Sequence, residues 1–250
     1  MTSVHLIGGG WEPDFASAVY GQFLEEAAAA ASGAGRPGKP IIACVVLDEG
    51  DGREQFGRWE SVLRTVGNCE PVPILVGQDS PLHISALGNS DGLLVCGGLT
   101  PGYAAAIAPA VADILDWLLL GGRPYAGFSA GSSVAAASAI VGGWLSGGVP
   151  ICPDDAAEDL EELTLAPGFG LVPFHVDVHC AQWGTLPRLI AAVRAASGGS
   201  GVGIDENTVL IIGPDAAVVR GRGQVWHARQ SAGGAVSVSA YRAGQEVPLR

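Results

Sequence analysis

The stretch Ala-Gly-Phe-Ser-Ala-Gly-Ser at residues 126–132 decides how the rest of the chain is interpreted. An apolar run leads into Ser129, and a run of small residues follows it. The Gly-x-Ser-x-Gly spacing is typical of a nucleophile elbow, a sharp strand-to-helix turn that exposes a serine hydroxyl. Gly127 and Gly131 suit that turn because a Cβ at either position would clash with closely approaching backbone. The stretch therefore predicts a serine nucleophile; the alternative is an ordinary turn in a chain that contains 38 glycines.

Short apolar runs alternate with helical segments on both sides of this turn. The predicted strands cover residues 4–7, 41–47, 72–76, 92–96 and 125–128, and the predicted helices cover 15–31, 56–66, 103–120 and 130–139. Such alternation favours right-handed crossovers and a parallel sheet with helices on both faces. The expected fold class is therefore α/β, a parallel-sheet αβα sandwich. Its functional site should lie beyond the carboxyl ends of the strands, where Gly8, Gly97 and Ser129 all fall.

The sequence changes in character after residue 140. Residues 141–170 contain glycine, proline and an acidic cluster, and we expect a loop or surface helix near the mouth of the site, with its charges in solvent. A strand is predicted over 171–179 and a helix over 186–196. From residue 202, short β runs predict a C-terminal β meander, with an irregular or edge-like tail after residue 230. Without a repeat or linker, residues 1–250 are expected to form a single α/β hydrolytic domain.

Composition limits the classes of partner. The chain has 13 Lys and Arg against 25 Asp and Glu, a net charge of −12, which argues against nucleic acid and anionic membranes. No signal peptide precedes the first strand, and no apolar run approaches the length of a membrane span. The cysteines lack Cys-x-x-Cys spacing and predict free thiols in a reducing compartment: Cys44, Cys69, Cys96, Cys152 and Cys180. We expect a cytoplasmic protein without cofactor or resident metal.

A serine nucleophile needs a base, and the best histidine lies in the segment Pro-Phe-His-Val-Asp-Val-His-Cys at residues 173–180. Strand alternation would put His175, Asp177 and His179 on one face. His179 stands at the end of the predicted strand, where it can reach the active edge of the sheet. His175 lies four residues deeper, so His179 is the expected base.

Two further parts of a hydrolytic site can be proposed from the sequence. The carboxylate that orients the base is Asp205 or Glu206, and spacing alone does not choose between these neighbours. The oxyanion needs two N–H donors. We expect one from Ala130, next to the nucleophile, and the other from Gly98 or Leu99, in the loop after the predicted strand 92–96.

Together these segments resemble peptidase family S51, the peptidase E and cyanophycinase group. The resemblance covers about residues 4–212 and rests on the glycines at 8–10, Gly-Gly-Leu-Thr at 97–100, the elbow, Asp-Val-His at 177–179 and Gly-Ile-Asp-Glu-Asn-Thr at 203–208. It implies the class I glutamine amidotransferase-like, flavodoxin-like fold and a serine peptidase or isopeptidase. It also implies Ser129 as nucleophile, His179 as base and, as in the cyanophycinase branch, Glu206 as the acid.

The specificity residues depart from both branches. Peptidase E has an arginine after the elbow helix, whereas residues 138–141 carry no cation here, and the segment after His179 keeps only Arg188. Binding an acidic side chain without a paired cation is costly. Trp144 and Trp183 instead predict an aromatic pocket, with Thr100 and Arg188 as further substrate contacts. The expected substrate is a small peptide or isopeptide, and a homodimer is left open.

Three other interpretations were weighed. The chain could be a non-catalytic binding or assembly member of the same fold. The triplet His175, Asp177 and His179 could bind a divalent metal for hydrolysis. Thiol chemistry could use Cys96 or Cys180, although neither lies in an elbow.

Overall fold

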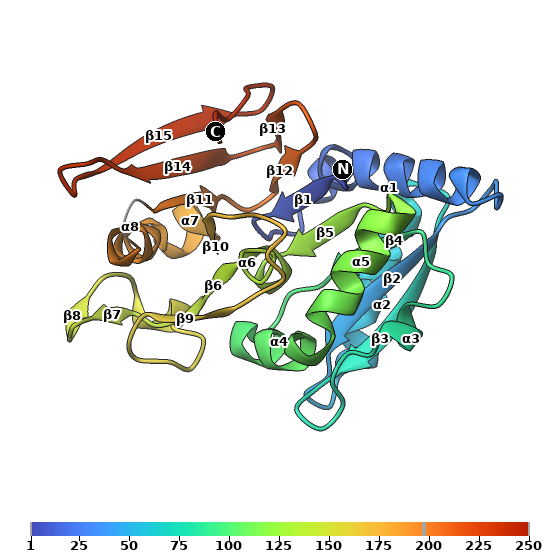
Figure 1. The fold of residues 1–250 in the computed structure, drawn as a ribbon, viewed down its shortest axis with the longest axis horizontal. Coiled ribbons are helices and arrows are strands. Elements are labelled where there is room, and N and C mark those ends of the chain that lie inside the picture. The colour runs from blue at the N-terminus through green and yellow to red at the C-terminus, as the bar shows by residue number, and fades with distance from the viewer. Residues whose placement is uncertain (1, 197–198, 250) are drawn as a thin grey trace.

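The computed structural model describes residues 2–196 and 199–249 (Figure 1). A seven-stranded sheet forms its centre, in the order β13 (Ala217–Gly221), β12 (Thr208–Ile212), β1 (Val4–Ile7), β5 (Tyr125–Phe128), β4 (Gly92–Val95), β2 (Ile41–Leu47) and β3 (Glu70–Val76). β1, β5, β4, β2 and β3 run parallel, β12 is antiparallel to β1, and β13 is antiparallel to β12. The predicted α/β fold with a mostly parallel sheet is confirmed.

The order of the parallel strands determines where the helices lie. The chain moves in one direction along the sheet from β1 to β2 and β3, through α1 (Ala16–Gly33) and α2 (Gly52–Val66). It then returns the other way to β4 and β5, through α3 (Ile84–Leu87), α4 (Thr100–Ile107) and α5 (Val111–Gly121). Right-handed crossovers in opposite directions place the two groups of helices on opposite faces. The strand β1 pairs in parallel with β5, so its carboxyl end lies next to the elbow.

A second sheet contains much of the C-terminal part of the chain. Its order is β10 (His175–Val178), β11 (Ser200–Ile204), β14 (Gln224–Gln230) and β15 (Val236–Arg242), and α7 (Cys180–Trp183) and α8 (Leu186–Ala195) follow β10 (Figure 1). The predicted C-terminal strands are thus present, but β12 and β13 join the central sheet while β11, β14 and β15 do not. The tail after residue 230, expected to be irregular or edge-like, includes β15, which is the edge strand of this sheet.

The helix predicted over 130–139 is shorter than expected. α6 (Ala130–Ser133) is a single turn, and the chain then enters β6 (Ser138–Gly142), which pairs with β9 (Thr164–Pro167). The Ser132 hydroxyl accepts the N–H of Ile7 and lies 2.6 Å from the carbonyl of Gly127, so this residue ties the turn to β1 and β5. Between β6 and β9 lie the short hairpin of β7 (Leu145–Ser146) and β8 (Val149–Pro150) and the turn η3 (Asp154–Ala156).

The apolar stretch Thr100–Gly121 corrects a second expectation. By length and composition alone it could cross a membrane, although no run was expected to approach that length. The single helix predicted over 103–120 is divided into α4 and α5 by the turn η2 (Ala108–Ala110), because Pro109 lacks the N–H that a continuous helix needs. Side chains of this stretch that join the hydrophobic core include Tyr103, Ile107, Ile114 and Leu118. One such stretch is weak evidence for a membrane span, because a helix in the core of a folded domain passes the same test of length and composition.

Candidate active site

Ser129 lies in a tight turn between β5 and α6. Its backbone has φ 52° and ψ −111°, a conformation that non-glycine residues rarely adopt and that is concentrated at functional sites. A Cβ at Gly127 would lie 2.3 Å from the carbonyl oxygen of Gly131, and one at Gly131 would lie 2.0 Å from that of Val95. Both glycines are therefore required by the close approach of backbone, as a nucleophile elbow requires.

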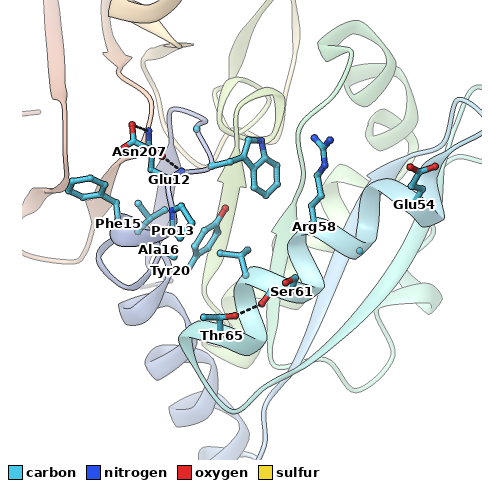
Figure 2. Close-up of a pocket in the computed structure, with 15 residues that line it drawn as sticks. Glu12, Pro13, Phe15, Ala16, Tyr20, Glu54, Arg58, Ser61, Thr65 and Asn207 are labelled. Carbon is cyan, nitrogen blue, oxygen red and sulfur yellow. Dashed lines mark hydrogen bonds between the residues drawn. The ribbon is translucent and has the colours of Figure 1, made fainter.

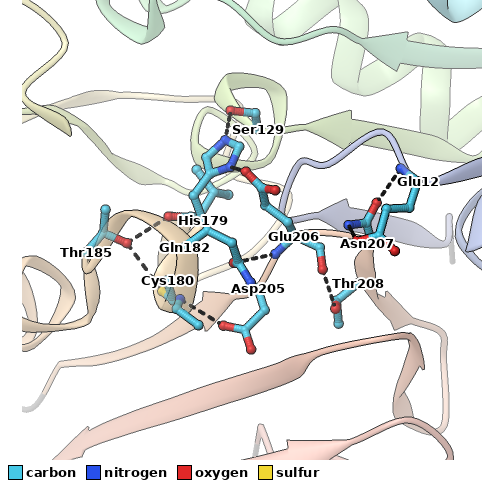
Figure 3. Close-up of polar contacts among 12 residues, drawn as sticks. Glu12, Ser129, His179, Cys180, Gln182, Thr185, Asp205, Glu206, Asn207 and Thr208 are labelled. Carbon is cyan, nitrogen blue, oxygen red and sulfur yellow. Dashed lines mark hydrogen bonds and ion pairs between the residues drawn. The ribbon is translucent and has the colours of Figure 1, made fainter. Parts of the chain in front are cut away.

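A line of hydrogen bonds runs from Ser129 through His179 to Glu206 (Figure 3). The Ser129 Oγ lies 2.7 Å from His179 Nε2, and His179 Nδ1 lies 2.8 Å from Glu206 Oε1. The three residues come from the ends of β5, β10 and β11. With its proton on Nδ1, the imidazole donates to the carboxylate and accepts from the serine hydroxyl. This arrangement can activate a hydroxyl as a nucleophile.

Trp183 and Gly9 lie close against the imidazole of His179. Its ring stacks on Trp183 with centroids 3.8 Å apart and 7° between the planes. On Gly9, a Cβ would lie 2.1 Å from His179 Cε1, so only glycine leaves room for the ring. The backbone N–H of His179 also donates to the carbonyl of Gly8, at 3.1 Å. The glycine run after the first strand, a signal visible in the sequence, thus supports the base, a role that the sequence analysis missed.

The predicted strand over 171–179 is shorter than expected, and this changes the predicted face. β10 ends at Val178, and His179 has φ 54°, in the left-handed region. The alternation that would align His175, Asp177 and His179 therefore stops before His179. This left-handed residue turns the imidazole away from the β10 row and toward Ser129.

Asp205 and Glu206, the two neighbours that spacing left open, have different surroundings. The carboxylate of Asp205 accepts hydrogen bonds from the N–H groups of Ala181 and Gln224 and from the indole of Trp226, at 2.8–3.1 Å. It is buried and joins β11, α7 and β14. Only Glu206 contacts the imidazole, so its carboxylate is the one placed to orient His179.

Backbone N–H groups border the cavity beside Ser129. Gly98 and Leu99 line this cavity, and within the described part of the chain neither N–H has a protein acceptor. The hydroxyl of Tyr103 lies 3.3 Å from the carbonyl of Gly97. Because the peptide is trans, this contact turns the Gly98 N–H to the opposite side. Ala130 begins α6, so its N–H has no partner within that helix.

Burial sets the protonation preference of His179. Desolvation lowers its pKa below the usual 6.5 and outweighs the hydrogen bond and charge of Glu206, which act in the other direction. A neutral imidazole is the form that accepts a proton from serine. The base is therefore in the neutral form that catalysis requires near neutral pH.

The cavity beside Ser129 has a volume of about 660 Å³. Trp144 and Trp183 line it, in the position that the sequence analysis gave them. Six carboxylates also line it: Glu49, Asp154, Asp155, Glu158, Asp159 and Glu161. The acidic run, expected near the mouth of the site with its charges in solvent, therefore forms one wall of this cavity.

Two predicted substrate contacts lie elsewhere. Arg188 is only 4% exposed and does not line the cavity. Its guanidinium makes a bidentate ion pair with Asp177, with N–O distances of 2.9 and 2.7 Å, and donates to the carbonyl of Ala156. Thr100 is buried, and its N–H donates to the Glu158 carboxylate at 2.9 Å. The polar groups of both residues already have protein partners. We therefore assign them to supporting the cavity wall and not to contacting substrate.

The metal and thiol alternatives receive no support from the geometry. His175 contacts the carbonyl of Ser138, and Asp177 pairs with Arg188. Within residues 2–196 and 199–249, no three His, Cys, Asp or Glu side chains converge to hold a metal ion. Cys96 and Cys180 are buried, and burial raises the pKa of each thiol, the opposite of an activated thiolate.

A second cavity, of about 830 Å³, lies between α1 and α2 (Figure 2). Its wall is largely apolar and includes Trp11, Phe15 and Tyr20. It approaches the hydrogen-bonded line only through Gly10 and Asn207 and does not include Ser129. The smaller cavity, which holds the reactive side chains, is therefore the candidate active site.

Comparisons with known proteins find solved structures with a similar fold. A peptidase from an acI-B1 Actinobacterium has a similar structure, with a TM-score of 0.68, 18% identity and coverage of 99% of this chain and 96% of that one. A protein described as a peptidase E from Listeria monocytogenes EGD-e gives 0.58 and 13%, over 89% of this chain and 100% of that one. These identities show the fold alone. A search of curated proteins gives no match.

The sequence itself identifies the family. Residues 53–219, more than half of the 250 residues, match the family described as Peptidase family S51. The matched range contains the elbow, the histidine and the carboxylate described above. The chain therefore belongs to peptidase family S51 and is a serine-type peptidase.

Proposed function

We propose that this protein hydrolyses small peptides or isopeptides through a triad of Ser129, His179 and Glu206. The observation that carries the proposal is the continuous line of hydrogen bonds, 2.7 Å from serine to imidazole and 2.8 Å from imidazole to carboxylate. The strained backbone of Ser129 supports it, because such strain is retained where the surrounding structure fixes a functional group.

The first half of the reaction forms an acyl-enzyme. The Ser129 oxygen attacks the substrate carbonyl while His179 Nε2 takes its proton. Glu206 stabilises the imidazolium through its bond to Nδ1–H. The N–H groups of Ala130 and of Gly98 or Leu99 stabilise the oxyanion. The imidazolium then gives its proton to the leaving amine as the carbonyl–nitrogen bond breaks.

The second half releases the acyl group. A water molecule attacks the ester carbon while His179 removes one of its protons. Collapse of the second tetrahedral intermediate breaks the ester bond, and the imidazolium returns the proton to Ser129. The products are a carboxylate and the amine released earlier, and the enzyme regains its initial state.

We further propose a cytoplasmic protein with one hydrolytic domain. All five cysteines are free, and four of them are buried, as suits a reducing compartment.

Hydrolysis of a dipeptide and isopeptide library by the purified protein tests the proposed reaction. We expect release of free amines that EDTA leaves unchanged, because no step uses a metal. Activity abolished by EDTA and restored by a divalent cation would instead support metal-dependent hydrolysis. A folded protein that binds library members without cleaving any would support a binding module.

The pH profile gives a second prediction. kcat/KM should fall on acidification as His179 gains a proton, with the midpoint below pH 6.5, since burial lowers the pKa of this imidazole. Trp183→Ala opens one face of the ring to water and should move the midpoint upward. Initial rates between pH 4 and 9 measure both; an acid midpoint above 6.5 in the wild type contradicts the expected desolvation.

A further inference from the structure

The wall of the active-site cavity is strongly negative. Six carboxylates line it, and among the described lining residues there is no Lys or Arg. None of the six belongs to any of the ion pairs in the described part of the chain. Among the described residues, these six carboxylates therefore have no cationic side chain at ion-pair distance.

Glu158 is the least solvated of these carboxylates. It is half-buried, and desolvation raises its pKa, although the N–H of Thr100 donates to its Oε2 at 2.9 Å. Burying an anion without a cation is unfavourable. Where the chain buries Asp177, it supplies Arg188 as a bidentate partner. The charge of Arg188 acts on Glu158 only from beyond ion-pair distance, because its guanidinium is paired with Asp177. Among the described residues no arginine or lysine forms an ion pair with Glu158, so a cation from outside the chain would complete this site.

The loop that carries the wall is built to hold this position. Glu158 and Asp159 have φ values of 55° and 60°, and the carbonyl of Ala157 accepts the N–H of Gly143 at 2.9 Å. A Cβ at Gly142 would lie 2.8 Å from the Glu158 Cβ, so glycine there lets the loop pack against β6. These contacts fix the backbone of the loop at Ala157 and Glu158 in the cavity wall.

Aromatic rings in the same cavity add to this preference. Trp144 and Trp183 line it, and Trp183, stacked on the imidazole by one face, remains 40% exposed. An indole face attracts a cation through its quadrupole. The net charge of −12 also draws cationic molecules toward the protein.

We propose that the preferred substrate is a short peptide with a cationic group near the scissile bond, which Glu158 and its neighbouring carboxylates bind. The cation is an arginine or lysine side chain or the free α-amino group; these share the same chemistry and are separated by the test. The proposal rests on Ser129 as the nucleophile, since that residue makes this cavity the active site.

Binding to the Ser129→Ala protein, measured by titration calorimetry, tests the charge preference without turnover. The probes are Ala-Arg-Ala and Ala-citrulline-Ala, each with a free and an acetylated N-terminus, because citrulline is a neutral analogue of arginine. We expect at least a 10-fold lower Kd for one or both charged members, and a smaller ratio at high salt. If the bound cation is the arginine side chain, the arginine peptides bind more tightly than the citrulline peptides. If it is the α-amino group, the peptides with a free N-terminus bind more tightly than the acetylated ones.

Variants of the wall link the effect to its cause. Glu158→Gln keeps an oxygen to accept the Thr100 N–H but removes the charge, and it should reduce the charged-to-neutral ratio several-fold. Glu25→Gln, an exposed carboxylate on α1 outside the cavity, removes the same charge and should leave the ratio unchanged. The charged-to-neutral ratio is taken within each variant, so a change in affinity that is common to all peptides does not affect it.

Equal binding of charged and neutral peptides, or tighter binding of an acidic peptide such as Ala-Glu-Ala, overturns the proposal. An unchanged charged-to-neutral ratio in Glu158→Gln contradicts the role proposed for Glu158. Labelling of Ser129 by a fluorophosphonate is measured separately on the wild-type protein. Labelling with no charge preference therefore refutes only the substrate class, whereas a charge preference without labelling refutes the proposed nucleophile.

Discussion

Ser129→Ala should lower kcat on peptide substrates by about 10⁴–10⁶-fold, because residues of a triad act as a unit and the acyl-enzyme cannot form without the hydroxyl. The structure gives no reason for a loss of fold. The alanine keeps the Cβ of Ser129, and the hydroxyl that ties the turn to the sheet belongs to Ser132. Steady-state rates and thermal unfolding of both proteins measure the two effects.

The matched control is Ser146→Ala, which removes an exposed hydroxyl on β7. We expect its rate to equal that of the wild type. Ser129→Ala retaining more than about 1% of wild-type kcat while folded would contradict a nucleophilic role for this residue.

Glu206→Gln should lower kcat by about 10²–10⁴-fold, because an amide can no longer stabilise the imidazolium and permits the wrong tautomer of His179. Its partly exposed position favours the lower part of this range, since water screens the lost charge. The neighbouring Asp205→Asn should act chiefly on stability, because Asp205 joins three elements through buried hydrogen bonds.

The contrast between these neighbours is the useful readout. Rates extrapolated to full folding, together with the free energy of unfolding from urea titration, separate catalysis from stability. An inactive but stable Asp205→Asn beside a fully active Glu206→Gln would reverse the proposed acid.

The sequence was most informative where chemistry restricts the local backbone. Gly127 and Gly131 are required by the elbow, and the alternation of strands and helices predicted that the carboxyl ends of β1, β4 and β5 lie at the same edge of the sheet. The apolar strands are buried and leave little freedom for another arrangement. These features allowed Ser129 and His179 to be proposed as partners although 50 residues separate them.

Features that depend on tertiary contacts were harder to predict. Spacing could not separate Asp205 from Glu206, because the choice depends on which of the two carboxylates accepts hydrogen bonds from the N–H groups of α7 and β14. The small residues after Ser129 predicted a long helix, but Ser132 bonds to β1 and the chain turns into β6. Arg188, the cation nearest to His179 in the following sequence, was assigned to substrate, because its buried partner Asp177 could not be recognised.

The acidic run at residues 154–162 shows the same limit. A charge run usually faces solvent, so these residues were expected near the mouth of the site but without a role in binding. Its position over the cavity depends on left-handed backbone at Glu158 and Asp159, which neither residue type predicts. The loop therefore had to be seen in three dimensions before its charge could be connected with specificity.

Peptide mapping by mass spectrometry after treatment with a fluorophosphonate tests the central claim most directly. The claim is that the Ser129 hydroxyl, activated by His179 and Glu206, is the nucleophile of this peptidase. We predict one phosphonyl adduct per chain, located on Ser129 and absent from Ser129→Ala. No adduct on the folded wild type, or the same adduct on another residue in Ser129→Ala, would contradict the claim.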